Sequence, residues 1–154
     1  MRPTLCLLTG VLICGCEPAP QPFQEAVDLR ELMLHVVEPA AEIYWDSVGT
    51  VMDLEGTKEI APATIDEWTA VENAAATLAE AGNLLLIPAR QREDPRWQQF
   101  ATAMIESGRK ALVAADGRDA DAVFEAGGNI YIVCADCHAA FVPALLPANF
   151  RQAE

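Results

Sequence analysis

A five-residue motif near the end of the chain constrains the fold more than any other feature. Cys134-Ala135-Asp136-Cys137-His138 has the pattern C-x-x-C-H. This pattern is typical of c-type haem attachment, in which two thiols take up the haem vinyl groups as thioethers and the adjacent imidazole binds the iron. On a helix, positions i, i+3 and i+4 share one face, so the two thiols and the imidazole point at one macrocycle. The motif therefore predicts one covalently bound haem c.

Two other uses of paired cysteines fit the sequence less well. A thioredoxin-like C-x-x-C belongs to a βαβ pattern, whereas the residues on both sides of this motif favour a helix. A structural zinc site needs four ligands, usually as two pairs. Beyond the motif and the N-terminal segment, the chain offers one thiol, Cys16, and one histidine, His35. Haem attachment is the interpretation we prefer.

The N-terminal segment has the order of a secretory signal peptide: an early charge, an apolar run and a small residue. The apolar run is too short to cross a membrane as a helix. Residues 13–16, with the sequence ICGC, resemble a bacterial lipobox, in which the last cysteine is lipidated and becomes the new N-terminus. We expect residues 1–15 to be removed and residues 16–23 to form a Pro-rich tether attached to lipid through Cys16.

The five cysteines of the chain support this interpretation. Cys6 and Cys14 leave with the signal peptide, Cys16 takes lipid, and the two motif cysteines take haem. If cleavage occurred elsewhere, Cys16 would be an unpaired thiol in an oxidising compartment. We therefore expect an anchored protein on the periplasmic side of the bacterial envelope. Glu17 is not the Asp-type signal for inner-membrane retention, which favours the outer membrane.

The charge of the chain restricts its partners. It has 10 basic and 23 acidic residues and a net charge of −13. This charge opposes binding to nucleic acid and would attract basic partner proteins. No nucleophile is paired with a base outside the motif, and the one further histidine, His35, cannot complete a triad, so we expect no enzyme activity.

The spacing of apolar residues predicts four helices. The first runs from about Gln24 to Met52, with a kink near Glu38 because Pro39 follows, and a loop covers residues 53–62. The other three helices have recognisable start and stop signals. The second helix starts at the capping box of residues 64–67 and stops before Pro88. The third starts at Asp94-Pro95 and ends at Asp116-Gly117, and the fourth starts at Asp119 or Asp121 and stops at Pro143.

Four helices with short connections, and no run with strand period, predict an all-α fold. We expect an antiparallel four-helix bundle with covalently attached haem on the last helix. The cytochrome domain would span residues 24–143, and residues 144–154 would form a C-terminal tail. Gly127 and Gly128 are poor helix formers. They are either tolerated in a buried helix or leave room for the macrocycle or a neighbouring helix.

A four-helix chain of this length with C-x-x-C-H on its last helix resembles the class II c-type cytochromes, the cytochrome c′ family. The resemblance covers about residues 24–143 and rests on the motif and its position. It implies that His138 is the proximal iron ligand and that the first helix supplies the distal residue. Residues 30–33 (RELM) are similar to the distal segment and place Met33 opposite the iron. The family often has a basic residue four positions after the proximal histidine, where this chain has Val142.

The role of Met33 separates two functions. A methionine on an apolar stripe is often only core, but the interpretation we favour is that Met33 ligates the iron, as in Met/His cytochromes. The protein then transfers electrons between redox partner proteins of the envelope. If Met33 is not a ligand, a five-coordinate iron leaves an apolar distal site for small gases such as NO or CO.

Three further expectations concern neighbours and assembly. His35 is a rival ligand, but it lies on nearly the opposite side of the helix from Met33. Arg30 is either a partner of a haem propionate or a surface arginine. The haem could also be mainly structural in an assembly module, and the sequence leaves open whether two bundles pair as a homodimer.

Overall fold

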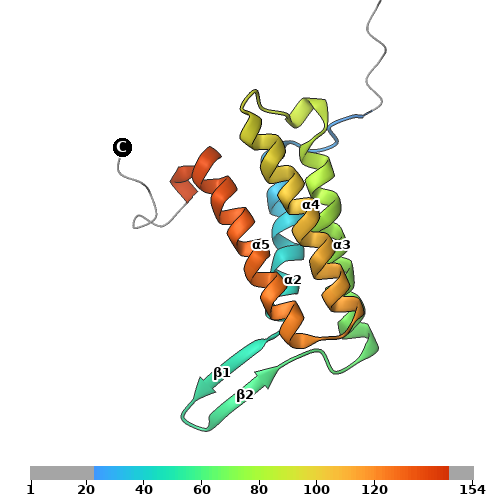
Figure 1. The fold of residues 1–154 in the computed structure, drawn as a ribbon, viewed down its shortest axis with the longest axis vertical. Helices are drawn as coiled ribbons and strands as arrows, with labels where there is room; N and C mark the ends of the chain where they lie inside the picture. Colours follow the sequence, from blue (N-terminus) through green and yellow to red (C-terminus); the bar gives the residue numbers. More distant parts are fainter. Residues whose placement is uncertain (1–22, 146–154) are drawn as a thin grey trace, which may run out of the picture.

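The computed structural model describes residues 23–145 of the chain (Figure 1). One continuous helical segment comes first and is made of three parts: α1 (Leu29–Leu32), a π-helical part (Met33–Val37) and α2 (Glu38–Asp46). A hairpin of β1 (Gly49–Asp53) and β2 (Gly56–Ile60) follows. The remaining elements are α3 (Ile65–Leu85), a 3-10 turn (Pro88–Arg90), α4 (Pro95–Asp116), α5 (Ala120–Phe141) and a second 3-10 turn (Pro143–Leu145).

The helices of residues 23–145 form an antiparallel bundle, but the prediction of an all-α fold was wrong. An antiparallel hairpin pairs Gly49 with Ile60 at its base and Asp53 with Gly56 at its tip, and it projects from one end of the bundle (Figure 1). The first helical segment therefore ends at Asp46 and not at Met52. The predicted loop 53–62 contains the second strand.

Local chemistry at the hairpin tip explains why the chain turns here. The Asp53 carboxylate accepts hydrogen bonds from the backbone N–H groups of Glu55 and Gly56, at 2.8 and 3.1 Å. Gly56 has φ of 133°, a backbone conformation that side chains disfavour. An aspartate that closes a turn and a glycine at positive φ are the turn chemistry of a tight hairpin.

The kink expected from Pro39 takes the form of the π-helical part. Its backbone N–H group at Glu38 donates to the Met33 carbonyl, five residues earlier, instead of four. Proline has no N–H group and clashes with the preceding turn of a regular helix. A wider turn placed just before Pro39 relieves this conflict, and Met33 is its first residue.

A buried arginine fixes the start of the first helical segment. Arg90 is 4% exposed and donates to the backbone carbonyl groups of Val27 at 2.6 Å and Leu84 at 3.1 Å. Its Nε lies 3.5 Å from a carboxylate oxygen of Glu25. These contacts join the residues before Leu29 to the C-terminal end of α3.

The tightest packing lies between α3 and α4. A Cβ atom built on Gly108 of α4 would lie 2.5 Å from the backbone nitrogen of Ala79 on α3. The same construction on Gly82 of α3 would meet the Ile105 side chain at 2.6 Å. Glycine at both positions therefore allows the two backbones to approach closely. The first segment packs mainly against α3, and α5 packs mainly against α4.

The predicted starts of α3, α4 and α5 are confirmed, the last at Asp119, which accepts from the backbone N–H group of Ala122 at 3.1 Å. The first two follow clear sequence signals. Thr64 and Glu67 form the expected capping box, with hydrogen bonds of 3.2 and 2.9 Å. Asp94 accepts from the backbone N–H group of Arg96 at 2.9 Å, and Pro95 is the first residue of α4. Both signals depend on neighbours in sequence, which is why sequence patterns reveal them.

The predicted N-terminal processing falls outside the described residues. These predictions are the signal peptide (1–15), lipid attachment at Cys16, nearly all of the tether (16–23) and most of the tail (144–154). Between residues 23 and 145, no helix combines the length and the apolar character needed to cross a membrane.

Candidate functional site

A cavity of about 240 Å³ lies between the first helical segment and α5. Three residues singled out from the sequence, Met33, Cys134 and His138, all line it. The rest of the wall consists of Val37, Glu38, Ala41, Trp45, Tyr131 and Ala135. The fold therefore brings the predicted distal residue to the same cavity as part of the C-x-x-C-H motif.

The spacing along each helix explains this arrangement. Met33, Val37, Ala41 and Trp45 recur every four residues along the first segment, so they share one face. On α5, Tyr131, Cys134 and His138 recur at three- and four-residue spacing. The Trp45 and Tyr131 rings meet edge to face at 6.2 Å. Because the two helices run antiparallel, Met33 lies toward the end of the cavity that His138 occupies.

The two cysteines are free thiols with different exposure to the cavity. Cys134 lines it, whereas Cys137 is half-buried one turn further along and is not part of the wall. Burial raises the pKa of Cys134. Burial, and then the charge of Cys134, raise the pKa of Cys137 to about 11. Neither thiol is in a disulfide, so both are available for thioether formation.

The second half of α5 is unusually exposed for an apolar helix. The buried residues of α5 all lie in its first half, before the motif; they are Val123, Ala126, Gly127 and Ile130. After them, Tyr131 is 59% and Ile132 56% exposed. At the C-terminal end, the Phe141 ring packs edge to face on Trp97 of α4, at 5.2 Å.

This exposure bears on whether a haem fits the site. The 240 Å³ cavity is smaller than pockets that enclose a drug-sized ligand. A macrocycle bound at the motif would need both the cavity and the uncovered apolar surface beside it. Apart from Glu38 and the motif itself, the cavity wall is mainly apolar. Together with two free thiols and the potential iron ligands His138 and Met33, it supplies the groups that would hold a covalent haem, so the residues present fit it.

A metal site made of protein side chains alone has no support in the described chain. Between residues 23 and 145, no three His, Cys, Asp or Glu side chains are grouped so that they could hold a metal ion. Haem iron differs because the macrocycle supplies most of its ligands, and the protein adds one or two.

Other candidates from the sequence lie away from the cavity. His35 and Arg30 are exposed and line no part of it. Val142, at the place where the resembled family often has a basic residue, is 40% exposed and ends the helix of the motif.

Sequence reasoning missed Trp45 and Tyr131. The Trp45 indole N–H donates to the Gly127 backbone carbonyl at 3.0 Å. A Cβ atom on Gly127 would lie 3.2 Å from Trp45 Cδ1, whereas a Cβ atom on Gly128 would meet nothing within 4 Å. Gly127 therefore makes room for a neighbouring helix, one of the two roles that the sequence left open. The four-residue step from Ala41 to Trp45 was visible in the sequence, but the residue it faces was not.

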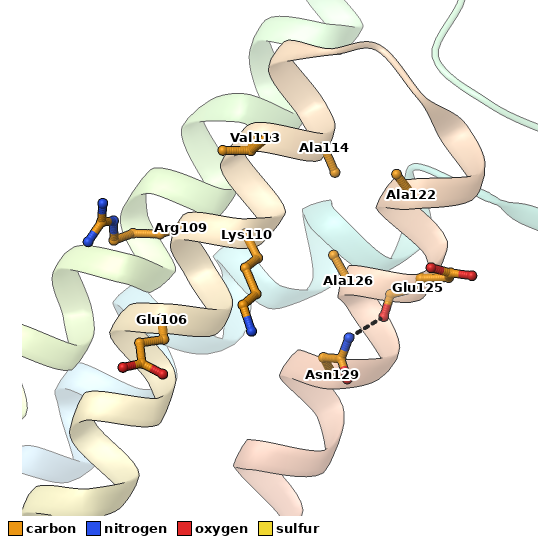
Figure 2. A pocket seen from close by; sticks show the side chains of 9 residues that line it. All are labelled: Glu106, Arg109, Lys110, Val113, Ala114, Ala122, Glu125, Ala126 and Asn129. Carbon is orange, nitrogen blue, oxygen red and sulfur yellow. Dashed lines mark hydrogen bonds between the residues drawn. The ribbon is translucent and has the colours of Figure 1, made fainter.

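A larger groove of about 600 Å³ lies between α4 and α5, near the start of α5 (Figure 2). Lys110 extends into it from α4 toward Asn129, whose side chain donates to the Glu125 backbone carbonyl at 3.1 Å. Glu106 and Arg109 also line the groove. It contains none of the residues predicted to bind a cofactor, so size alone does not identify the site.

Comparison with known proteins found no family model that matches the chain, no similar curated protein and no similar solved structure.

Proposed function

We propose that this protein is a c-type cytochrome that transfers electrons in the bacterial envelope. One haem c is bound covalently by Cys134 and Cys137, and its iron is ligated by His138 and Met33. The observation that carries this proposal is that Met33 and His138, from the first and last helices, line one cavity with Cys134.

Each residue has a defined part in this proposal. The haem supplies reversible one-electron chemistry at its iron. The His138 imidazole provides a nitrogen ligand, and the Met33 thioether provides a neutral sulfur ligand that raises the reduction potential. Val37, Ala41 and the ring of Trp45 keep the wall of the cavity apolar. Outside the C-x-x-C-H motif, no Ser, Thr, Cys or Lys lines the cavity, so we propose no enzyme activity.

The proposal includes a place in the cell. Lipidation of Cys16 anchors the protein to the periplasmic side of the envelope, in the outer membrane. The net charge of −13 favours redox partners with basic surfaces.

Absorption spectra of the purified haem protein test the ligand pair. We expect six-coordinate, low-spin ferric haem with the weak band near the red edge of the spectrum that thioether ligation produces. Met33→Ala should lose this band, become high-spin and bind CO when reduced. Met104→Ala is the matched control, because Met104 is a buried methionine of α4 that does not line the cavity.

Two results would contradict the proposal at different levels. Complete loss of haem from the wild-type chain on acid–acetone extraction would exclude covalent attachment by Cys134 and Cys137. Wild-type protein that is already high-spin and binds CO without delay would retain the cytochrome but favour five-coordinate gas binding over electron transfer.

A further inference from the structure

The first helical segment and α5 are joined at one point by a side-chain hydrogen bond. Trp45 of α2 donates its indole N–H to the Gly127 carbonyl of α5 at 3.0 Å. Within residues 23–145, no other side-chain hydrogen bond connects these two helical segments. The spacing of the two helices therefore depends on Trp45 more than on any other polar contact.

Two residues of α5, Gly127 and Tyr131, contact the indole around this hydrogen bond. Gly127 carries no side chain, and a Cβ atom there would press on the indole at 3.2 Å. Tyr131 closes the other side of the indole edge to face, with ring centres 6.2 Å apart and an interplanar angle of 65°. The indole thus sits between a bare backbone turn and an aromatic ring of the same helix.

Two cavities meet at Trp45. A second cavity, of about 290 Å³, shares Trp45 and Tyr131 with the 240 Å³ cavity that Met33 and His138 line. The two rings are therefore a common wall with open space on both sides. Packing alone does not fix the indole here, which increases the importance of its hydrogen bond to Gly127.

Neighbouring contacts hold the rest of the first segment to other helices. Tyr44 is 0% exposed, and its hydroxyl donates to the Ala111 carbonyl of α4 at 3.2 Å. Arg90 fixes the beginning of the segment to the end of α3. Trp45 is thus the contact that sets the position of the segment relative to the helix of the C-x-x-C-H motif.

We infer that Trp45 is a positioning residue: its hydrogen bond to Gly127 sets the spacing of α2 and α5 at which Met33 reaches the iron. This inference rests on the proposed function. Because Arg90 and Tyr44 hold the first segment to α3 and α4, loss of the Trp45 contact would let α5 shift. At about 1.5 Å per residue, His138 lies roughly 16 Å along α5 from Gly127, so a tilt of about 5° at Gly127 would move His138 by roughly 1.4 Å relative to Met33. A displacement of that size would weaken a bond from Met33 to the iron.

Substitution of two tryptophans separates this role from general stability. Trp45→Phe keeps a ring and removes the N–H donor. Trp97→Phe is the matched control, because the Trp97 indole also donates to a backbone carbonyl, that of Leu85 at 2.9 Å, and this hydrogen bond joins α4 to α3. The phenyl ring of the variant keeps an aromatic contact for Phe141 of α5. We expect Trp45→Phe to raise the ratio of high-spin to low-spin haem by roughly two- to tenfold, the equilibrium effect of one net hydrogen bond. The reduced variant should bind CO more readily, and Trp97→Phe should leave both properties unchanged even where it lowers the melting temperature.

A pair of adjacent glycines gives a second test that does not depend on the folding of Trp45→Phe. Gly127→Ala places a Cβ atom against the indole, whereas Gly128→Ala meets no atom within 4 Å. We expect the first variant to shift toward high-spin haem and the second to retain the wild-type spectrum. Hydrogen exchange of the Trp45 indole N–H, followed by NMR in the reduced protein, should accelerate in Gly127→Ala only.

The outcomes distinguish the two levels of inference. If wild-type haem is low-spin and neither Trp45→Phe nor Gly127→Ala changes its spectrum, the positioning role is wrong and the proposed ligand pair stands. If wild-type haem is high-spin, Met33 is not a ligand, and both the electron-transfer proposal and the role of Trp45 are overturned.

Discussion

Gly108→Ala is the substitution whose effect follows most directly from the packing of the bundle. The added methyl group would lie 2.5 Å from the backbone nitrogen and 2.7 Å from the Cα atom of Ala79. An ordinary contact of a Cβ atom lies at 3.4–4 Å. The atoms it meets belong to the backbone of α3 and cannot rotate away, so α3 and α4 would have to separate by about 1 Å.

The change in the free energy of unfolding is the difference between a steric cost and a gain in helix propensity. Overpacking of this kind costs about 1–3 kcal/mol, whereas alanine in place of glycine in a helix gains about 0.5–1 kcal/mol. Gly128→Ala is the matched control, because its Cβ atom meets nothing within 4 Å. It should therefore show the favourable term alone. The free energies of unfolding of the two variants should differ by the full overpacking cost, about 1–3 kcal/mol.

Thermal unfolding followed by circular dichroism measures this difference. For a domain of this size, 1 kcal/mol corresponds to a shift in Tm of about 4 °C. We expect Gly128→Ala to melt above wild type and Gly108→Ala to melt about 4–12 °C below Gly128→Ala. A Gly108→Ala variant as stable as Gly128→Ala would show that α3 and α4 do not approach as closely as described.

Three further predictions concern a buried hydroxyl, a helix cap and the lipid anchor. Tyr44→Phe should cost about 1 kcal/mol through the lost hydrogen bond to Ala111. Burial raises the pKa of Tyr44 to about 12, so the unfolded chain loses the hydroxyl proton at a lower pH than the folded chain does. The free energy of unfolding of the wild type should therefore fall between about pH 10 and 12. Urea titrations at alkaline pH should show no such fall in Tyr44→Phe. Thr64→Ala should cost roughly 1 kcal/mol in urea unfolding because the cap of α3 is lost, whereas Thr77→Ala, in the interior of the same helix, should cost less. Cys16→Ser should move the protein from the membrane to the soluble periplasmic fraction, and a native protein already wholly soluble would exclude the anchor.

Sequence patterns predicted the parts of the fold that depend on near neighbours in the chain. The capping box at residues 64–67 and the Asp94-Pro95 start were both visible, because caps involve residues within one turn. The hairpin of residues 49–60 was not predicted. A strand is recognised by alternation between a buried and an exposed face, and both strands of this hairpin are exposed along almost their whole length. With no buried face there was no alternation, and the spacing of Val48 and Met52 extended the helix pattern into a strand.

In the candidate site, too, contacts between near neighbours in the chain could be predicted, and contacts between distant helices could not. The C-x-x-C-H motif lies within two turns of α5, so the sequence alone predicts that its thiols and imidazole lie close together, and haem attachment stays a prediction. Met33 came from a resemblance, and the structure places it on the wall of the cavity that Cys134 and His138 also line. Trp45 could not be predicted as a contact of Gly127, because the register between two helices distant in sequence depends on the packing of the whole bundle.

The hydrogen bond between Trp45 and Gly127 also has a consequence for the order of folding. Its partners are 82 positions apart, compared with 12 for the Trp97 indole and its acceptor Leu85. Closing a long loop costs more conformational entropy than closing a short one, so contacts between consecutive helices form more readily than contacts between the first and the last. The first helical segment with α3, α3 with α4 and α4 with α5 are all consecutive pairs, so each can assemble before the first segment closes on α5. Until that contact forms, the face of α5 that carries Cys134 is open to solvent, and in the proposed function the thiols would then be accessible for haem attachment.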